Sequence, residues 1–210
     1  MDRQLRVIPG TMVLAGLTAS ALLTGCDSPS GPAAASASPT RSAPSSVSLA
    51  TPQSLASGRY ERAADTPELT KRRAEAQKSL PAGVTSVVAV YNKPDDADSA
   101  LTLSGSYGKD LGDARAVLDA MFGSLGFSQA SPSSSRQTFP PAGPNAPDLQ
   151  CETVKVREGV FAPVCAWAQK TDAALLLATD PKQTTANAVD LPAFAKTAAT
   201  VYTEIRQPEH

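Results

Sequence analysis

Few residues of this 210-residue chain could perform acid–base or nucleophilic chemistry. The single histidine is His210, the last residue of the sequence, which leaves a serine nucleophile without an evident base and excludes most histidine-dependent metal centres. Four carboxylates that are near in sequence could serve a glycosidase: Asp95, Asp98, Asp110 and Asp113. We expect these four to be turn and helix-cap residues first, so the sequence predicts no catalytic residue, no cofactor and no enzymatic activity.

The acidic segment 92–99 invites comparison with a calcium-binding loop. An EF-hand loop needs oxygen ligands at its first, third and fifth positions, a glycine at the sixth and a glutamate at the twelfth. In the register that starts at Asp96 only Asp98 fits, because the fifth, sixth and twelfth positions hold alanine, leucine and tyrosine. The segment is therefore predicted to be a solvated turn, and no metal site is expected.

The first of the three cysteines, Cys26, ends a segment typical of secretion signals. Arg3 and Arg6 precede an uncharged apolar stretch over residues 12–23, which is too short to span a bilayer, since that needs about 20 residues. The four residues 23–26, Leu-Thr-Gly-Cys, resemble the bacterial lipobox. We expect residues 1–25 to be a cleaved lipoprotein signal peptide and Cys26 to carry lipid; the alternative is an ordinary signal peptide with an incidental cysteine.

Residues 26–57 are expected to be a disordered tether that follows the lipid. Asp27 to Ser57 contains 10 serines, 7 alanines and 5 prolines, with no aromatic residue. Such a segment buries too little apolar surface to offset the entropy of ordering it. The sequence thus predicts a protein held by its acylated cysteine in the lipid bilayer, on the outer face of the cytoplasmic membrane, with one folded domain over 58–210.

The other two cysteines, Cys151 and Cys165, form an even pair in an oxidising compartment, and we expect them to be joined. A three-residue hairpin loop over 157–159, with its glycine in the left-handed conformation, places the two cysteines directly opposite each other and sets Val156 opposite Val160. A disulfide that closes a loop of this size is worth about 3 kcal/mol in the chain-entropy model.

The remaining sequence alternates between helix and strand patterns. Strands are predicted over 84–91, 100–106, both arms of the cysteine hairpin and 173–179, and helices over 66–80, from Asp110 to 125, and 190–206. Consecutive strands with short turns indicate an α+β domain: an antiparallel sheet of about five strands, with two or three helices mainly on one face and one disulfide. Trp167 is expected in the core beside the disulfide rather than at a binding site.

Two surface segments leave alternatives open. The cluster Lys71-Arg72-Arg73 could contact anionic lipid or wall polymer, but a solvated helix face with a Glu68–Arg72 pair is favoured. Residues 131–149, rich in proline and serine, are expected to be a surface insertion, the alternative being a mobile loop that covers something. With 19 Lys plus Arg against 20 Asp plus Glu, no nucleic-acid partner is expected.

The order of these features resembles a group of uncharacterised lipoproteins and membrane-anchored proteins of actinobacteria. The resemblance covers roughly residues 80–206, and its most specific element is Cys151 followed by Cys165-Ala166-Trp167. Relatives commonly carry an acid two positions after the tryptophan, where this chain has Gln169. The group has no established activity, so the resemblance implies location and fold and transfers no catalytic residue.

The function expected from the sequence is a lipid-anchored, extracytoplasmic, noncatalytic module that binds a ligand or an envelope partner, either an envelope protein or a wall polymer. Two alternatives remain at this stage. One is a carboxylate-dependent cell-wall hydrolase, which requires a cleft with two carboxyl groups within about 10 Å of each other. The other is a purely structural envelope lipoprotein, which would lack a concave apolar pocket.

Overall fold

The structure, a computed structural model, describes residues 47–125, 131–143 and 145–208. The expected signal peptide 1–25, the lipidated Cys26, the first part of the tether and His210 lie outside the described residues. The elements are, in chain order, β1 (Val47–Leu49), β2 (Ser54–Leu55), β3 (Tyr60–Arg62), α1 (Pro67–Lys78), β4 (Val84–Lys93), β5 (Asp96–Gly108), α2 (Ala114–Ser124), β6 (Ser131–Pro132), β7 (Gln137–Phe139), β8 (Leu149–Arg157), β9 (Val160–Ala168), β10 (Asp172–Thr179), η2 (Ala186–Ala188), α3 (Leu191–Ile205) and β11 (Arg206–Pro208).

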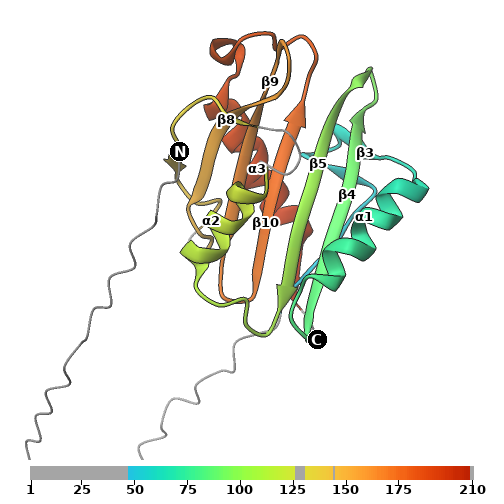
Figure 1. Cartoon of the computed structure of the whole chain (residues 1–210), viewed down its shortest axis with the longest axis vertical. Helices are drawn as coiled ribbons and strands as arrows, with labels where there is room; N and C mark the ends of the chain where they lie inside the picture. The colour runs from blue at the N-terminus through green and yellow to red at the C-terminus, as the bar shows by residue number, and fades with distance from the viewer. Residues whose placement is uncertain (1–46, 126–130, 144, 209–210) are drawn as a thin grey trace, which may run out of the picture. The chain divides into compact units, whose positions relative to one another are not determined.

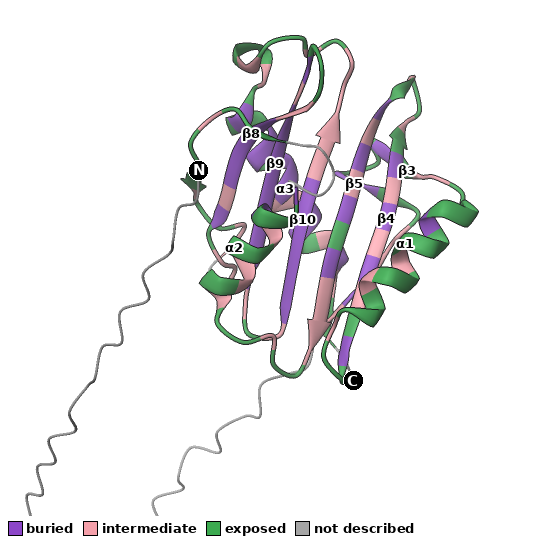
Figure 2. Ribbon diagram, viewed as in Figure 1, coloured by how far each residue is buried: buried purple, intermediate pink, exposed green. Residues whose placement is uncertain are grey.

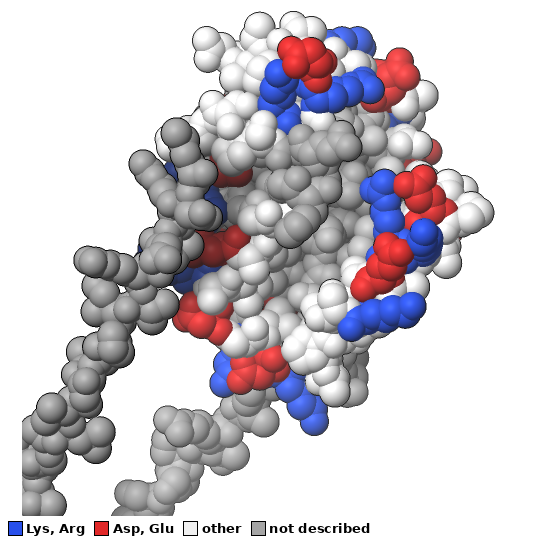
Figure 3. Space-filling view, in the orientation of Figure 1, with Lys and Arg blue, Asp and Glu red and all other residues white. Residues whose placement is uncertain are grey.

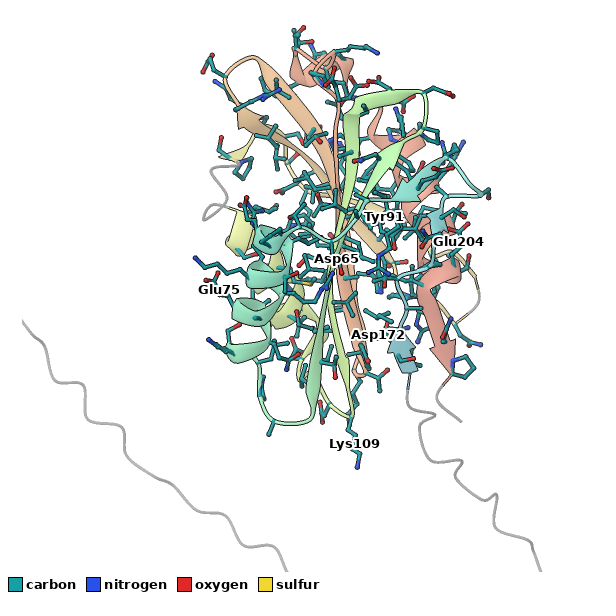
Figure 4. The ribbon with its side chains drawn as sticks, turned by 90° about the vertical axis from the view of Figure 1, so that its right-hand side faces the viewer. Asp65, Glu75, Tyr91, Lys109, Asp172 and Glu204 are labelled. Carbon is teal, nitrogen blue, oxygen red and sulfur yellow. A yellow bond between two sulfur atoms is a disulfide. The ribbon has the colours of Figure 1, made fainter. Side chains whose placement is uncertain are left out.

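The main sheet has the strand order β2-β3-β4-β5-β10-β9-β8-β6, with β7 also paired to β8, and all its pairs are antiparallel. The α+β class and the central position of β10 are confirmed, and the sheet has nine strands rather than about five. Among the α-helices that the structure describes, α1 and α2 cover one face of the sheet and α3 covers the other (Figures 1 and 4). β1 and β11 form a separate pair.

The two faces of the sheet bury different side chains because successive residues of a strand point to opposite sides. On β9, Cys165 and Trp167 join the core beneath α3, whereas Val164 and Ala166 join the core beneath α2. Strands β8, β9 and β10 are mostly buried along their length, as Figure 2 shows. Trp167 is fully buried in the same cluster as the disulfide, as the sequence predicted.

The cysteine hairpin has the expected register at the disulfide but a different turn. Cys151 lies opposite Cys165, and their sulfurs are bonded at 2.06 Å. At the turn, Arg157 pairs with Val160, and the register shifts between Lys155 and Arg157. The expected Val156–Val160 pair is therefore wrong. The chain combines a two-residue turn with a bulge in β8, and the bulge restores the register that aligns the cysteines.

The folded domain begins earlier than the expected boundary at residue 58. β1 pairs with β11, β2 pairs with β3, and Leu49, Leu55 and Ala56 are buried in the core beneath α3. The composition of this stretch is that of a tether, but two leucines and a few backbone pairs are sufficient to fix it on the sheet. Residues 47–57, which were expected to belong to the tether, are therefore part of the folded domain.

Three local boundaries also differ from expectation. The β4–β5 connection is a tight turn, because Lys93 already pairs with Asp96, whereas a loop over 92–99 was expected. The cap of α2 is Asp113, whose carboxylate accepts from the Ala116 N–H at 2.9 Å, rather than Asp110. The insertion 131–149 is not wholly irregular, since β6 and β7 lie along β8 and the side chain of Phe139 packs against the core.

Candidate functional site

A groove with a cavity volume of about 470 Å³ lies between α1 and α2, on the face of the sheet that these helices cover only in part. Four segments line it: the end of α1 with the turn that follows, the start of β4, the end of β5 with the turn that follows, and α2. The lining residues are Ala76, Ser79, Leu80, Pro81, Val84, Ser86, Ser104, Gly105, Ser106, Asp110, Leu111, Val117, Ala120, Met121 and Ser124.

Three serines form the floor of the groove. Ser86 of β4 lies opposite Ser106 of β5, and Ser104 lies two residues further along the same face. Their neighbours Val87 and Leu103 point to the other face and enter the core beneath α3. The alternation of the strands thus presents hydroxyl groups to the groove while it keeps the apolar side chains under α3.

Apolar side chains form the walls. Leu80 follows α1, Leu111 precedes α2, and Val117 and Met121 lie one turn apart on α2, all of them half-buried. Along α1 on this side of the molecule, positive and negative side chains alternate (Figure 3). With these apolar walls and the serine hydroxyl groups of its floor, the groove suits an apolar ligand that makes a few polar contacts.

Asp110 supplies the only carboxylate among the described residues that line the groove. Its carboxylate accepts from the Gly112 N–H at 2.8 Å and lies 3.6 Å from the Lys170 ammonium. These two interactions, the backbone hydrogen bond first, lower the pKa of Asp110. The group is therefore an ionised turn residue rather than a general acid.

The four carboxylates considered from sequence are not brought together. Asp95 and Asp98 lie at the β4–β5 turn and the start of β5, whereas Asp110 and Asp113 follow the end of β5. β5 has 13 residues, and at about 3.3 Å per residue it separates the two pairs by roughly 40 Å. The four carboxylates therefore do not share one site, and Asp110 alone of the four lines the groove.

The acidic turn forms an ion pair instead of a calcium loop. The Asp96 carboxylate lies 2.7 Å from the Lys182 ammonium, and this bond is the main cause of the lowered pKa of Asp96. Within the described ranges, no group of three or more His, Cys, Asp or Glu residues is arranged to hold a metal ion.

A buried polar cluster beside the disulfide was missed at the sequence level. Asp172, which is fully buried, accepts from the Trp167 indole N–H at 3.3 Å and from the Arg206 guanidinium at 3.0 Å. The Tyr202 ring lies edge-on to Trp167 with centroids 5.3 Å apart, and its hydroxyl accepts a short bond from Arg206. Burial raises the pKa of Tyr202, partly offset by Arg206.

This cluster joins the start of β10 to the end of α3, and none of its four residues lines the groove, so we assign it a structural role. Gln169 links the cluster to the insertion, since its amide oxygen accepts from the Tyr202 hydroxyl at 3.5 Å and its amide nitrogen donates to the Asn145 carbonyl at 3.1 Å. The sequence signal for the cluster is weak because its charged members, Asp172 and Arg206, are 34 residues apart.

The insertion 131–149 packs elsewhere than at the groove, as far as the structure describes it. None of its described residues lines it, and residues 139–142 instead form a second hollow of about 390 Å³ against α3, with Pro192, Ala195 and Ala199. Arg136 from the same insertion binds Asp119 of α2 at 2.7 Å and lies over the Phe122 ring at 4.0 Å. The insertion thus holds α2 on the sheet.

Among the described helices, none combines the length and the apolar character that crossing a bilayer requires. No protein-family model, curated protein or solved structure matches the chain.

Proposed function

We propose that this protein is a lipid-anchored, extracytoplasmic, noncatalytic module that binds a ligand in the groove between α1 and α2. The observation that carries the proposal is the groove itself. Its volume of about 470 Å³ lies within the range of roughly 300–1,000 Å³ that is usual for small-molecule sites. A purely structural envelope protein has no need of such a concavity.

The chemistry of the lining supports binding rather than catalysis. Ser86, Ser104 and Ser106 are the nucleophile-bearing side chains of the floor, and none of the described lining residues is a histidine, lysine or glutamate that could act as their base. Asp110 is held as a carboxylate by its backbone and lysine partners. The groove can therefore hold a ligand by apolar contact and hydroxyl hydrogen bonds.

The location rests on the first 26 residues of the sequence. A charged start, a short apolar stretch and the Leu23–Cys26 box stand in the order of a lipoprotein signal. Two acyl chains on Cys26 are what stable attachment to a membrane requires. In this proposal the remainder of the tether, up to residue 46, links the lipid to the domain.

A Cys26→Ser variant tests the anchor. The parent chain is expected in the membrane fraction of the producing cells, and the variant in the soluble or secreted fraction. Metabolic labelling with a radioactive fatty acid should mark the parent and not the variant. A variant that still sediments with membranes would contradict the anchor without bearing on the groove.

Binding of an uncharged, environment-sensitive apolar dye such as Nile red tests the groove, with the full Cys26→Ser chain in buffer free of detergent. We expect saturable binding. Ala120→Trp places an indole in the groove and should weaken binding by at least about tenfold, the equivalent of 1.4 kcal/mol. Ala116→Trp, exposed one turn earlier on the same helix and outside the lining, should bind like the parent. Equal binding by both variants would refute the groove as the site.

A further inference from the structure

At the end of the domain where β4 begins and β5 ends, the groove is lined by Pro81, Val84, Asp110 and Leu111, and we call this end its mouth. β1, the first described element, packs against β5 on the face opposite the groove. β1 and the groove lie on opposite sides of the same part of β5. Gly105 of β5 lines the groove, and a Cβ added to it would lie only 3.0 Å from the Leu49 side chain of β1. The C-terminal strand β11, which pairs with β1, lies at this same end (Figure 1).

In the proposed anchoring, the number of residues between the lipid and β1 limits how far this end of the domain can lie from the membrane. From Cys26 to Val47 there are 21 residues, and a tether of that length, if flexible, would have an average reach on the order of 25 Å, from about 5–6 Å × √21. A domain attached at β1 by such a tether therefore presents the groove end, rather than the opposite end with the β4–β5 turn, to the bilayer.

Two lysines lie next to lining residues of the groove at this end. Lys78 ends α1 next to the lining residue Ser79, and Lys109 precedes the lining residue Asp110. Lys109 directly follows the end of β5 and projects from the lower end of the molecule (Figure 4). Asp110 is paired with Lys170, whereas Lys78 and Lys109 have no ion-pair partner among the described residues. The mouth can therefore attract an anionic group that approaches from the membrane side.

From the position of the tether, the apolar walls and these two lysines together, we infer that the occupant of the groove is an anionic membrane lipid. Its acyl chain lies between α1 and α2, along Leu80, Val117 and Met121, and its acidic headgroup lies at Lys78 and Lys109. This inference rests on the proposed function and specifies its ligand. The groove runs from the mouth toward Ser124 along α2, which has 11 residues and is therefore about 16 Å long.

A fluorophore at the far end of the groove tests the inference. Ser124→Cys adds the only free thiol to the lipidated full chain, since Cys26 carries lipid and Cys151 is bonded to Cys165. The labelled chain is reconstituted into phosphatidylcholine vesicles that contain phosphatidylglycerol brominated near the ends of its chains. The matched control is a label at Thr203→Cys. Thr203 is exposed near the end of α3, close to β11 and on the other face of the sheet from the groove.

We expect the brominated lipid to quench the label at position 124 several-fold more than the label at position 203. Lys78→Glu combined with Lys109→Glu should reduce the apparent affinity for brominated phosphatidylglycerol, obtained from the quenching of the label at position 124, by at least about tenfold. Lys71→Glu, at the other end of α1, should not. Equal quenching at positions 124 and 203, or quenching by brominated phosphatidylcholine as strong as by phosphatidylglycerol, would overturn the inference.

Two further outcomes separate this inference from the proposed function. If Nile red binds in the groove but brominated lipid does not quench the label at 124, the ligand is not a membrane lipid and the binding function stands. If neither binds, both proposals fail. A different outcome is that, in vesicles without brominated lipid, the label at position 124 becomes less accessible to a water-soluble quencher as the protein concentration rises. That result would assign the groove to a second copy of the chain and overturn the inference of a lipid ligand.

Discussion

The carboxylate of Glu204 on α3 accepts hydrogen bonds from two consecutive backbone N–H groups, that of Ala56 at 2.6 Å and that of Ser57 at 2.8 Å. Ala56 and Ser57 have φ values of 55° and 57°, and Gly58 follows with 83°. Successive N–H groups in a turn of this kind form a concavity that binds anions. Glu204 thus fastens the N-terminal segment to the last helix of the domain.

Glu204→Ala should loosen this segment. Hydrogen bonds to a charged acceptor contribute about 1.5–3 kcal/mol, and because Glu204 is half-buried we expect a loss of about 2 kcal/mol in the free energy of unfolding, measured in urea. The amides of Ala56 and Ser57 should exchange hydrogen much faster. Glu75→Ala, which removes an exposed carboxylate 3.9 Å from Lys71, should change stability by less than about 0.5 kcal/mol. Unchanged exchange at both amides would show that the bonds do not hold the turn.

Ser57→Gly should stabilise the protein. A left-handed backbone costs an L-residue about 1–2 kcal/mol, which glycine avoids, while its extra freedom in the unfolded chain costs roughly 0.5–1 kcal/mol. Ser57 is exposed, so we expect a net gain of about 0.5 kcal/mol by urea unfolding. Ser54→Gly, in the neighbouring strand β2, is the control and should destabilise. Destabilisation by both substitutions would argue against the left-handed conformation at residue 57.

How far the sequence predicts the fold depends on where its signals lie. The pairing of Cys151 with Cys165 and the presence of the helices that became α2 and α3 follow from local periodicity and are confirmed, whereas the hairpin turn and the cap of α2 differ from the prediction. The segment 47–57 has no such local signal. Its residues with left-handed backbone, Ala56 and Ser57, are not glycine, and the residue that binds their N–H groups, Glu204, lies almost 150 residues away. β6 and β7 likewise have no sequence pattern that predicts them, because strands of two and three residues form only through their hydrogen bonds to β8.

The candidate site was unpredictable for a related reason. Its lining comes from four segments whose individual patterns indicate an ordinary helix or strand, for instance the serines at 104 and 106. The groove exists because α1 and α2 lie apart on one face (Figure 1) while α3 covers the other (Figure 4). The strand order that separates the two helices is a tertiary property, which a single sequence read by local patterns does not contain.

The buried charge of Asp172 depends on Arg206. Removing one partner of a buried ion pair costs about 3–5 kcal/mol, because the other charge remains uncompensated, so Arg206→Met should destabilise strongly. Adding Asp172→Asn should restore much of that loss. Lys182→Met, which breaks the exposed pair with Asp96, should have an effect within about 1 kcal/mol. Urea unfolding followed by emission of the single tryptophan measures all three; a double variant as unstable as Arg206→Met would contradict the pairing.

Glu152 should make the protein less stable as the pH rises. Burial raises the pKa of this carboxyl above its ordinary value, and Arg136, 3.9 Å away, offsets only part of the effect. Between the ordinary and the raised pKa the folded chain binds the proton and the unfolded chain does not, so the free energy of unfolding falls with increasing pH across that interval. Glu152→Gln should remove this decline, measured by urea unfolding from about pH 4 to about pH 8. A slope that is unchanged in the variant would contradict the assignment, and the exposed Glu158→Gln on the same hairpin serves as the control.

The outer edge of β4 is protected by side chains rather than by a strand. β3 pairs with β4 only at Tyr91 and Asn92. Further down the strand, the Gln77 side-chain amide donates to the Val84 carbonyl and accepts from the Ser86 N–H, both at 2.8 Å. Arg73 of α1 likewise donates to the Val88 carbonyl, at 2.9 Å from Nη2. An edge strand without such cover is a template for pairing with another chain.

Gln77→Ala should therefore expose this edge and promote association between molecules. We expect a loss of about 1 kcal/mol or more in the free energy of unfolding, because backbone groups of β4 lose their partners, and faster hydrogen exchange at Ser86. Light scattering should detect concentration-dependent growth that the parent lacks. Gln77→Glu keeps an acceptor for the Ser86 N–H but no donor for the Val84 carbonyl, and should lie between the parent and Gln77→Ala in both measurements. Lys71→Ala on the same helix should scatter light like the parent; if Gln77→Ala did so as well, the edge would be protected by packing of α1 alone.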